Sequence, residues 1–366
     1  MSERKKRVVV ALSGGVDSSV AAALLQEAGY EVIGITMQLQ PEEAQNVPGG
    51  CCSLETVEDA RQVAEKLKIP FYVVNFAEVF QKEVIDYFTA EYLKGRTPNP
   101  CIACNRQIKF AQLLERAIAL EADYLATGHY VKVAYNEERE RYLLYQAEDK
   151  HKDQSYVLYN LTQAQLARTL FPLGQFTKLQ IRKKAAELGL KVANKPESQE
   201  ICFIPDDNYK RFLRERVVPE MPGLKPGNFV NIKGEIIGKH KGISFYTVGQ
   251  RKGLGLALGY PVFVVALNPE KNTVVIGREE EVFQKELRAK ENNFIAIPRL
   301  TEPIKVQAKI RYGAQPAEAV ISEESDGRVK VIFADTQRAI TPGQAVVYYQ
   351  DDLVLGGGTI DEVIRQ

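Results

Sequence analysis

The first third of the chain alternates short apolar runs with segments whose apolar residues recur at helical spacing. Residues 7–12 are predicted as a buried strand, residues 18–28 as a helix and residues 30–37 as the next strand. The pattern continues with predicted helices at 56–67, 79–94 and 105–120 and predicted strands at 71–75 and 123–127. This order predicts an α/β fold with a doubly wound parallel sheet, in which ligands usually bind beyond the carboxyl ends of the strands.

The pattern changes after residue 129. Residues 130–135 and 141–147 predict a hairpin, and residues 177–189 predict one more helix. From about Asp206 onward, glycine and proline separate short alternating runs, at 228–232, 262–268, 273–276, 304–312, 317–321, 329–333 and 345–349. Such spacing is typical of small β-barrels or sandwiches.

The length of 366 residues, at about 150 residues per domain, predicts two or three domains. We place one boundary near Asp206 and a second in the charged stretch 281–291. The predicted domains are therefore an α/β domain at 1–205, a small β-rich domain at 206–282 and a β-barrel domain at 283–366.

The charge balance limits the class of partner. Lysine and arginine number 48 against 47 acidic residues, and the formal net charge of +1 excludes a globally basic nucleic-acid coat and an acidic solvating chain. A polyanionic partner would therefore have to bind a local patch of positively charged residues. Residues 178–195 and 225–252 each contain six lysines or arginines and a single acid, and such stretches either bind nucleic-acid phosphates or are merely solvated.

The apolar runs are short. None approaches the roughly 18 residues that a membrane-spanning helix requires. The apolar stretch that follows the basic start ends at Ser13, too early for a secretory signal. We therefore expect a cytoplasmic chain without a membrane partner.

The loop between the first predicted strand and helix, SGGVDS at residues 13–18, has the composition of an anion site. Gly14 and Gly15 let the backbone approach a ligand closely, while the N–H groups of the helix N-terminus and the serine hydroxyls donate to oxygen anions. The loop has no lysine followed by serine or threonine, so it is not the loop that holds a nucleotide for γ-phosphoryl transfer. The alternatives are a glycine turn with serine caps and, for Asp17, a helix cap.

The five cysteines are too few for a disulfide scaffold, so each is interpreted either as a chemically reactive thiol or as a packing residue. Cys101 and Cys104 form a Cys-x-x-Cys pair in a proline-rich loop before the helix predicted from residue 105. This would place Cys104 at a helix N-terminus, where a thiolate is favoured, with basic side chains following it. Cys202 stands alone, and two separated reactive thiols suggest a sulfur relay.

Packing is the alternative for Cys202, and metal binding is an alternative for the set. A structural zinc needs four ligands, and the chain has one Cys-x-x-Cys pair and three histidines, so no metal site is predicted. An iron–sulfur cluster on Cys101, Cys104 and Cys202 remains an alternative cofactor. Cys51 and Cys52 are interpreted as structural or incidental.

The loop at residues 13–18 resembles that of the PP-loop ATP pyrophosphatase superfamily, which has an adenine nucleotide alpha hydrolase-like fold. The resemblance implies that ATP is cleaved at its α-phosphate, so that an adenylate forms and pyrophosphate leaves. It also implies ATP and Mg²⁺ as cofactors and places Asp17 near the magnesium.

Further motifs are similar to those of the tRNA-uridine 2-sulfurtransferases, or tRNA-specific 2-thiouridylases, of this superfamily. They are NPCIACN at 99–105, EICFI at 200–204, GHY at 128–130, KDQSY at 152–156, TVGQRKG at 247–253 and RY at 311–312. Several separated motifs in the right order are more specific than any single motif.

This resemblance implies a role for each matching residue. The implied catalytic residues are Cys104, Cys202, which would carry a persulfide, and Asp17. ATP contacts are implied for Ala11, Leu12, Ser13, Gly14, Gly15, Val16, Asp17, Ser18, Met37 and Gly128. Contacts with the target base are implied for Asn99, Pro100 and Cys101. Contacts with tRNA are implied for His129, Lys152, Asp153, Gln154, Arg311, Tyr312 and Gln344.

The implied reaction is the ATP-dependent 2-thiolation of the wobble uridine in tRNA anticodon loops. Uridine O2 is adenylated, and persulfide sulfur from a catalytic cysteine is then transferred to C2, with release of AMP and pyrophosphate. The sulfur would come from a donor protein, either a cysteine desulfurase or a relay carrier, and the chain is expected to be a monomer. Many relatives have aspartate where this chain has Cys101, so an acid–base role at that position would fall to Cys101 or to another group.

Two other functions are consistent with parts of the pattern. A PP-loop ligase that forms amides on a small-molecule substrate would need neither Cys104 nor Cys202. An RNA-binding protein with a cysteine-held cluster would use the glycine loop only structurally. The sulfur relay, by contrast, requires both thiols to lie within reach of that loop.

Overall fold

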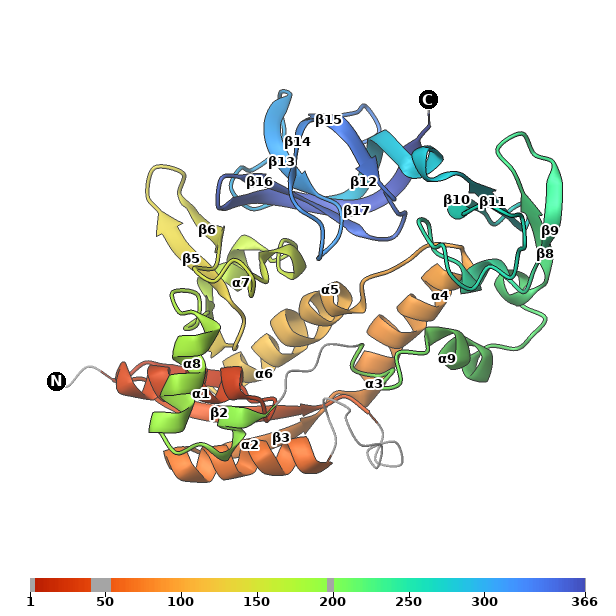
Figure 1. Ribbon diagram of the computed structural model, residues 1–366. Helices are drawn as coiled ribbons and strands as arrows, with labels where there is room; N and C mark the ends of the chain where they lie inside the picture. Colours follow the sequence, from red (N-terminus) through yellow and green to blue (C-terminus); the bar gives the residue numbers. More distant parts are fainter. Residues whose placement is uncertain (1–3, 41–53, 196–200, 366) are drawn as a thin grey trace.

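The computed structural model describes residues 4–40, 54–195 and 201–365, so Cys51, Cys52 and the first residue of the EICFI motif lie outside it. The first part of the chain folds around a five-stranded parallel sheet (Figure 1). In spatial order its strands are β3 (Phe71–Asn75), β2 (Glu31–Gln38), β1 (Arg7–Ala11), β4 (Tyr124–Ala126) and β7 (Thr169–Leu170). The predicted strands of this sheet are confirmed, and the short β7 was not predicted.

Helices cover both faces of this sheet. Consecutive residues of β1 point to opposite faces, and both faces carry apolar side chains that the helices bury. Val8 packs in a core shared with α1 (Val16–Glu27) and α2 (Leu54–Leu67). Val9 packs instead with side chains from the helices between residues 77 and 119. The doubly wound α/β fold is therefore confirmed.

Two long helices cover that second face, each with a π-helical middle section. One consists of α3 (Ala77–Phe80), η2 (Gln81–Asp86) and α4 (Tyr87–Leu93), and the other of α5 (Pro100–Cys104), η3 (Asn105–Leu113) and α6 (Leu114–Ala119). Wide turns of this kind are frequent at functional sites. Within the described ranges, neither these nor other helices are both long and apolar enough to cross a membrane.

The second of these helices begins at Pro100 and not near residue 105 as predicted. Asn99 caps it, since its Oδ1 accepts hydrogen bonds from the N–H groups of Cys101 at 3.0 Å and Ile102 at 3.4 Å. Pro100 fits the first helical position, where no N–H is needed. The prediction that Cys104 lies at a helix N-terminus is therefore wrong, and Cys101 occupies the first turn instead.

The predicted hairpin consists of β5 (Val131–Asn136) and β6 (Arg141–Gln146). The elements that follow it are η4 (Ser155–Val157), α7 (Gln163–Ala167), α8 (Lys178–Glu187) and η5 (Lys191–Asn194). Strand β6 also pairs with β17 (Leu353–Ile364), so the hairpin extends the C-terminal sheet.

The middle part of the chain contains a four-stranded sheet. Its spatial order is β10 (Phe263–Asn268), β11 (Thr273–Gly277), β8 (Gly227–Val230) and β9 (Ile236–His240). Helical segments flank it, namely α9 (Tyr209–Arg216), η6 (Pro222–Leu224), η7 (Ile243–Phe245) and η8 (Glu279–Val282). Strand β9 and helix α9 were not predicted.

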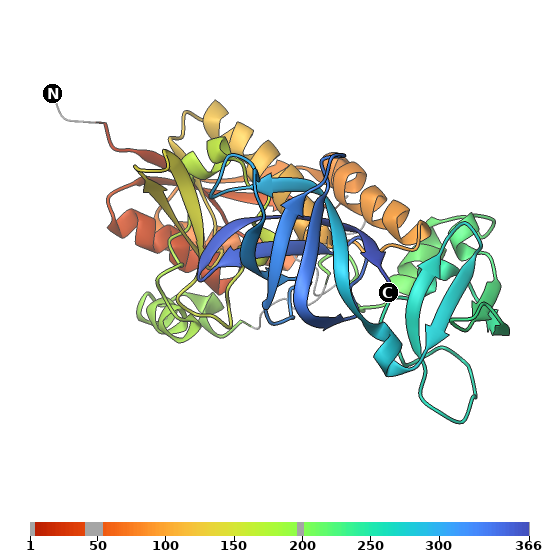
Figure 2. The same cartoon turned by 90° about the horizontal axis from the view of Figure 1, so that it is seen from above.

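The C-terminal part is a closed barrel, which Figure 2 shows between the α/β part and the middle part. Its strands are β12 (Phe283–Phe294), β15 (Val329–Arg338), β14 (Ala317–Glu323), β13 (Ile304–Lys309), β16 (Ala345–Gln350) and β17, and the pairing of β12 with β17 closes it. The charged stretch 281–291, predicted to separate two domains, is mostly strand β12. Leu287 and Ala289 are buried in the barrel, while the charged residues that alternate with them, Glu286, Arg288 and Lys290, are not buried.

Candidate active site

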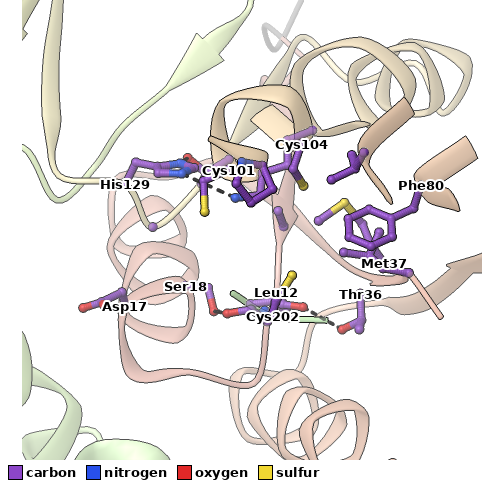
Figure 3. Close-up of a pocket in the computed structure, with 18 of the residues that line it drawn as sticks. Leu12, Asp17, Ser18, Thr36, Met37, Phe80, Cys101, Cys104, His129 and Cys202 are labelled. Carbon is purple, nitrogen blue, oxygen red and sulfur yellow. Dashed lines mark hydrogen bonds between the residues drawn. The ribbon is translucent and has the colours of Figure 1, made fainter. Parts of the chain in front are cut away.

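A cavity of about 310 Å³ opens at the carboxyl end of β1 (Figure 3). The chain adds β2 and β3 on one side of β1 and β4 and β7 on the other, so this is the switch point where open α/β sheets bind ligands. Segments far apart in the sequence line the cavity, with residues 11–13, 17–18, 36–37, 39, 80, 84, 100–101, 104, 109, 127–129, 154 and 201–203. Gly14, Gly15 and Val16 are not among the lining residues.

The loop after β1 has the backbone of an anion site. Gly14 has a φ of +67°, and a Cβ there would lie 2.3 Å from the carbonyl oxygen of Thr56, so only glycine fits. Gly15 is the N-cap of α1 and has no side chain to cap the helix, which leaves the N-terminal N–H groups to a ligand. The Ser18 hydroxyl accepts from the Ser13 N–H at 3.1 Å and donates to the Gly15 carbonyl at 3.2 Å, so it shapes the loop.

Met37 lies near the end of β2 and Gly128 follows β4, the two strands that flank β1, and both residues line the same cavity. A Cβ on Gly128 would lie 2.7 Å from the Ser18 nitrogen and 2.9 Å from the carbonyl carbon of Asp17, so glycine lets the end of β4 pack against the first turn of α1. Met37 and Phe80 contribute apolar surface opposite the glycine loop. The cavity thus combines a polar phosphate edge with an apolar wall, as an adenine nucleotide requires.

Asp17 lies in the first turn of α1, where its carboxylate forms an ion pair and is not used as a helix cap. Both carboxylate oxygens lie 2.8 Å from Lys178 Nζ, and the Tyr130 hydroxyl donates to Oδ1 at 2.6 Å. Figure 3 shows this carboxylate turned away from the labelled cysteines. Because Lys178 already neutralises it, Asp17 as placed does not fit a magnesium ligand.

Three cysteines line the cavity: Cys101 is exposed, Cys104 is buried and Cys202 is half-buried. Cys101 and Cys104 project from α5, and Cys202 lies near Leu12 on the other side of the view in Figure 3. The thiols of the predicted relay therefore share one cavity with the glycine loop. Among the residues that the structure describes, no three His, Cys, Asp or Glu side chains are grouped to hold a metal, so the cysteines as placed do not fit a cluster.

His129 and Lys109 add a polar side to the cavity. His129 Nδ1 lies 2.7 Å from Thr127 Oγ1, and Nε2 lies 3.5 Å from Lys109 Nζ. Since an ammonium only donates, Nε2 is the acceptor and the Nδ1–H donates to Thr127. Burial, and after it the Lys109 charge, hold the pKa of His129 well below its usual value, so the ring is neutral at pH 7. The ammonium of Lys109 faces the cavity as a cation that stabilises phosphate or thiolate charge.

Comparison with known proteins decides the family. The chain is 58% identical over 359 residues to the tRNA-specific 2-thiouridylase MnmA of Acetivibrio thermocellus, a match that covers 97% of this chain and 99% of that protein. The protein of the same name from Clostridium perfringens is 58% identical over 363 residues, covering 98% of this chain and 99% of the relative. The chain belongs to the tRNA-specific 2-thiouridylase family. The predicted family is thereby confirmed.

Family models match three successive parts of this 2-thiouridylase family member. A tRNA methyl transferase HUP domain matches residues 6–206, a tRNA methyl transferase PRC-barrel domain matches 210–278 and an aminomethyltransferase beta-barrel domain matches 284–360. These descriptions mention methyl transfer, whereas the full-length relatives are 2-thiouridylases and the cavity contains three cysteines. Among solved structures, a 4-thiouridine synthetase–RNA complex with bound ATP aligns with a TM-score of 0.38 at 22% identity, covering 59% of this chain and 51% of that chain.

The residues that the 2-thiouridylase resemblance assigns to tRNA lie in different settings. His129 and Gln154 line the cavity, so they meet only a nucleotide that enters it. Lys152, two residues before Gln154 in the sequence, is half-buried. Asp153 is buried and accepts hydrogen bonds from the Ala147 N–H at 3.0 Å and the Ser155 hydroxyl at 2.6 Å, so its carboxylate serves the fold.

The other three residues of that set belong to the barrel and do not line the cavity. The Tyr312 hydroxyl donates to the carbonyl of Asp153 at 3.2 Å, and Gln344 Nε2 donates to the carbonyl of Thr97 at 2.8 Å. The Arg311 guanidinium donates to a barrel carbonyl at 3.1 Å. Tyr312 and Gln344 therefore tie the barrel to segments that border the active site.

Of the three residues assigned to the target base, two line the active-site cavity and one does not. Pro100 and Cys101 line the active-site cavity. Asn99 does not, since its side chain caps α5 and it lines a neighbouring cavity of about 130 Å³.

Sequence reasoning missed three residues that build the site, Lys178, Tyr130 and Phe80. Lys178 was interpreted as part of a basic patch, and its pairing with Asp17 depends on how α8 packs on α1. Tyr130 belongs to the GHY motif that was noted without a role for this residue. No sequence signal marks Phe80, because the face of α3 that meets the cavity is set by packing on the sheet.

Proposed function

We propose that this chain catalyses ATP-dependent 2-thiolation of the wobble uridine in tRNA anticodon loops, as an enzyme of the 2-thiouridylase family. The observation that supports this most directly is that one cavity is lined by Cys104, by Cys202 and by Ser13, Asp17 and Ser18 of the glycine loop. The amide-ligase alternative gives no reason for thiols there, and the cluster alternative needs a grouping of ligands that the described residues do not have.

The first step activates the base. A uracil carbonyl oxygen is a poor leaving group, and attack of O2 on the α-phosphate of ATP converts it into the oxygen of AMP while pyrophosphate departs. The uncapped N-terminus of α1 and the Lys109 ammonium stabilise the phosphates. Bound magnesium would neutralise phosphate charge, and Asp17 is assigned no direct ligand role here because Lys178 holds it. Closure of the cavity around the base keeps water from hydrolysing the adenylate.

The second step transfers sulfur. A persulfide on Cys202 attacks C2 through its terminal sulfur, the C2–S bond forms and AMP leaves. The Cys104 thiolate then attacks Cys202 Sγ, which breaks the S–S bond, frees the 2-thiouridine and leaves a Cys104–Cys202 disulfide. If Cys104 acts first, hydrosulfide is released to attack C2, and the same disulfide remains. In both versions two thiols supply the electrons that reduce sulfane sulfur.

The sulfur itself must come from outside, because this chemistry consumes a persulfide that the chain does not make. We propose a sulfur-donor protein, a cysteine desulfurase or a relay carrier, as the second partner. Cys202 is half-buried, so it is the cysteine of this pair that a donor reaches more readily than the buried Cys104.

Local charge supports an RNA partner in one of the two basic stretches. The basic side chains of 225–252 are exposed and have no ion pair among the described residues, namely Lys225, Lys233, Lys239, Lys241, Arg251 and Lys252. In the stretch 178–195, by contrast, Lys178 pairs with Asp17, Lys184 pairs with Glu27 at 2.8 Å and Lys195 also has an acidic partner. The first patch is therefore the better candidate for phosphate contacts. A single-stranded anticodon loop presents its base at little unpairing cost.

The test is mass spectrometry of nucleosides from unmodified tRNA incubated with the protein, ATP, magnesium and a persulfide donor. We expect 2-thiouridine with the wild type and none with Cys104→Ser or Cys202→Ser. Both variants are expected to keep tRNA-dependent pyrophosphate release, because adenylation precedes sulfur transfer. Absence of 2-thiouridine even with the wild type, together with pyrophosphate release that depends on a small-molecule substrate and is unchanged in both variants, would instead favour an amide-forming ligase. Stoichiometric iron without ATP cleavage would favour the cluster protein.

A further inference from the structure

We propose that Cys101 is the resolving thiol of this enzyme: it attacks the Cys104–Cys202 disulfide, forms a Cys101–Cys104 disulfide and returns Cys202 as a thiol. This inference rests on the proposed function, since it starts from the disulfide that sulfur transfer leaves.

Position in the helix permits this bond. Cys101 and Cys104 are three residues apart in α5, so they lie within one α-helical turn, where Cα atoms are about 5 Å apart. Disulfides join Cα atoms roughly 4.4–6.8 Å apart, so the pair closes without a large movement of the backbone. The Asn99 cap on the Cys101 N–H holds the first turn in this form.

All three sulfurs belong to the lining of one cavity, so exchange needs no transfer between separate sites. The Lys109 ammonium faces the same cavity and stabilises the thiolates through which exchange proceeds. The neutral ring of His129 adds no competing positive charge and no acid there.

The exchange balances without an added reagent. The Cys101 thiolate attacks Cys104 Sγ, the Cys104–Cys202 bond breaks, and the Cys101–Cys104 bond forms. Cys202 leaves as a thiolate and takes up the proton that Cys101 has lost. No net oxidation occurs in this step, and a dithiol reductant from outside later reduces the Cys101–Cys104 disulfide by the same chemistry.

The three thiols differ in solvent exposure, and this difference explains what the exchange achieves. Cys104 is only 8% exposed, so a disulfide between Cys104 and the half-buried Cys202 offers a protein reductant little access. Moving the bond to Cys101 brings one sulfur to the surface and at the same time frees Cys202 for the next persulfide.

A single-turnover experiment tests this relay. The protein is loaded anaerobically with persulfide by a cysteine desulfurase, freed from reductant and mixed with unmodified tRNA, ATP and magnesium. Acid quenching, alkylation and peptide mapping then locate the disulfide. We expect the wild type to contain a Cys101–Cys104 disulfide and alkylated Cys202, and Cys101→Ser to contain a Cys104–Cys202 disulfide.

Repeated turnover gives a second readout. With a small dithiol protein such as a thioredoxin as reductant, Cys101→Ser is expected to turn over at least about tenfold more slowly than the wild type, and a small phosphine that enters the cavity is expected to restore the rate. A wild type that forms 2-thiouridine yet retains the Cys104–Cys202 disulfide, or that binds iron stoichiometrically through these thiols, would overturn the relay alone. Absence of both 2-thiouridine and any disulfide would overturn the proposed function and the relay with it.

Discussion

Lys178 Nζ lies 2.8 Å from each carboxylate oxygen of Asp17, so that one ion pair joins α8 to the first turn of α1. The Lys178 side chain is 11% exposed, and the Tyr130 hydroxyl donates to the same carboxylate. The residue that the resemblance assigned to magnesium is thus part of a partly buried polar link between the phosphate loop and α8.

Replacing Lys178 with methionine is expected to lower the free energy of unfolding by about 1–3 kcal/mol, because the partly buried Asp17 carboxylate loses its charged partner. Urea denaturation measures the change. Lys183→Met is the matched control, since this lysine on the same helix is 78% exposed and lies 3.9 Å from Glu187, and we expect a loss below about 0.5 kcal/mol. Equal losses in the two variants would contradict a structural role for the Lys178 pair.

Gly128→Ala is expected to weaken ATP binding at least about tenfold, which corresponds to about 1.4 kcal/mol. The added Cβ would lie 2.7 Å from the Ser18 nitrogen and push the end of β4 away from the phosphate loop. Calorimetric titration with a non-hydrolysable ATP analogue gives the affinity. In Gly313→Ala the new Cβ meets nothing within 4 Å, so the affinity should stay at the wild-type value. Unchanged binding in Gly128→Ala would show that this close packing does not shape the nucleotide site.

Arg96→Met is expected to destabilise the protein by about 3 kcal/mol and to expose the loop before α5 to proteases, because a buried charge network loses its centre. Arg96 is 15% exposed, lies 2.8 Å from Glu91 and 3.3 Å from Asp361, and donates to the carbonyl of Ile360 at 2.9 Å. Denaturation and limited proteolysis report the two effects. Lys94→Met serves as the control, because Lys94 also contacts Glu91, at 3.2 Å, but is 65% exposed. The idea fails if the Lys94 variant is cleaved as fast as the Arg96 variant.

The depressed pKa of His129 predicts a pH dependence of stability. The ring stays neutral in the folded protein, whereas in the unfolded chain it takes up a proton below its ordinary pKa of 6.5. The stabilisation is therefore complete above pH 6.5 and falls as the pH drops further, by up to about 1.4 kcal/mol per pH unit until the folded-state pKa is reached. Unfolding free energies of wild type and His129→Asn at pH 7 and pH 5.5 check this. The wild type should lose more stability than the variant, and parallel losses would rule out His129 as the linked group.

Local patterns predicted the α/β core well, because its strands are short apolar runs separated by segments with helical spacing. Residues 71–75 were predicted and observed as β3 at the same bounds, and the glycine loop follows β1 as expected. The same reasoning failed for β12, whose charged residues alternate with Leu287 and Ala289. Such a strand is polar on one face and looks like a linker until its barrel partners are known.

The site shows the same division between local and tertiary information. The cysteines and glycines were found because their chemistry is unusual at those positions. The start of α5 was misplaced because Asn99 and Pro100 were interpreted as a loop, although an asparagine followed by proline is also a helix start. That Cys101 and Cys104 share a cavity with Cys202, nearly a hundred residues later in the chain, depends on the fold. The proposed residue roles and the domain boundaries stay predictions.

The β5–β6 hairpin has a mechanical consequence. The Gln146 N–H donates to the Asp352 carbonyl at 2.8 Å, and Tyr145 is in register with Leu353 of β17, so strands from the nucleotide-binding part and the barrel share one hydrogen-bonded sheet. A barrel attached in this way cannot rotate freely relative to the nucleotide-binding part, because the backbone hydrogen bonds between β6 and β17 would have to break. A tRNA bound across both parts would therefore meet them in a fixed relative orientation.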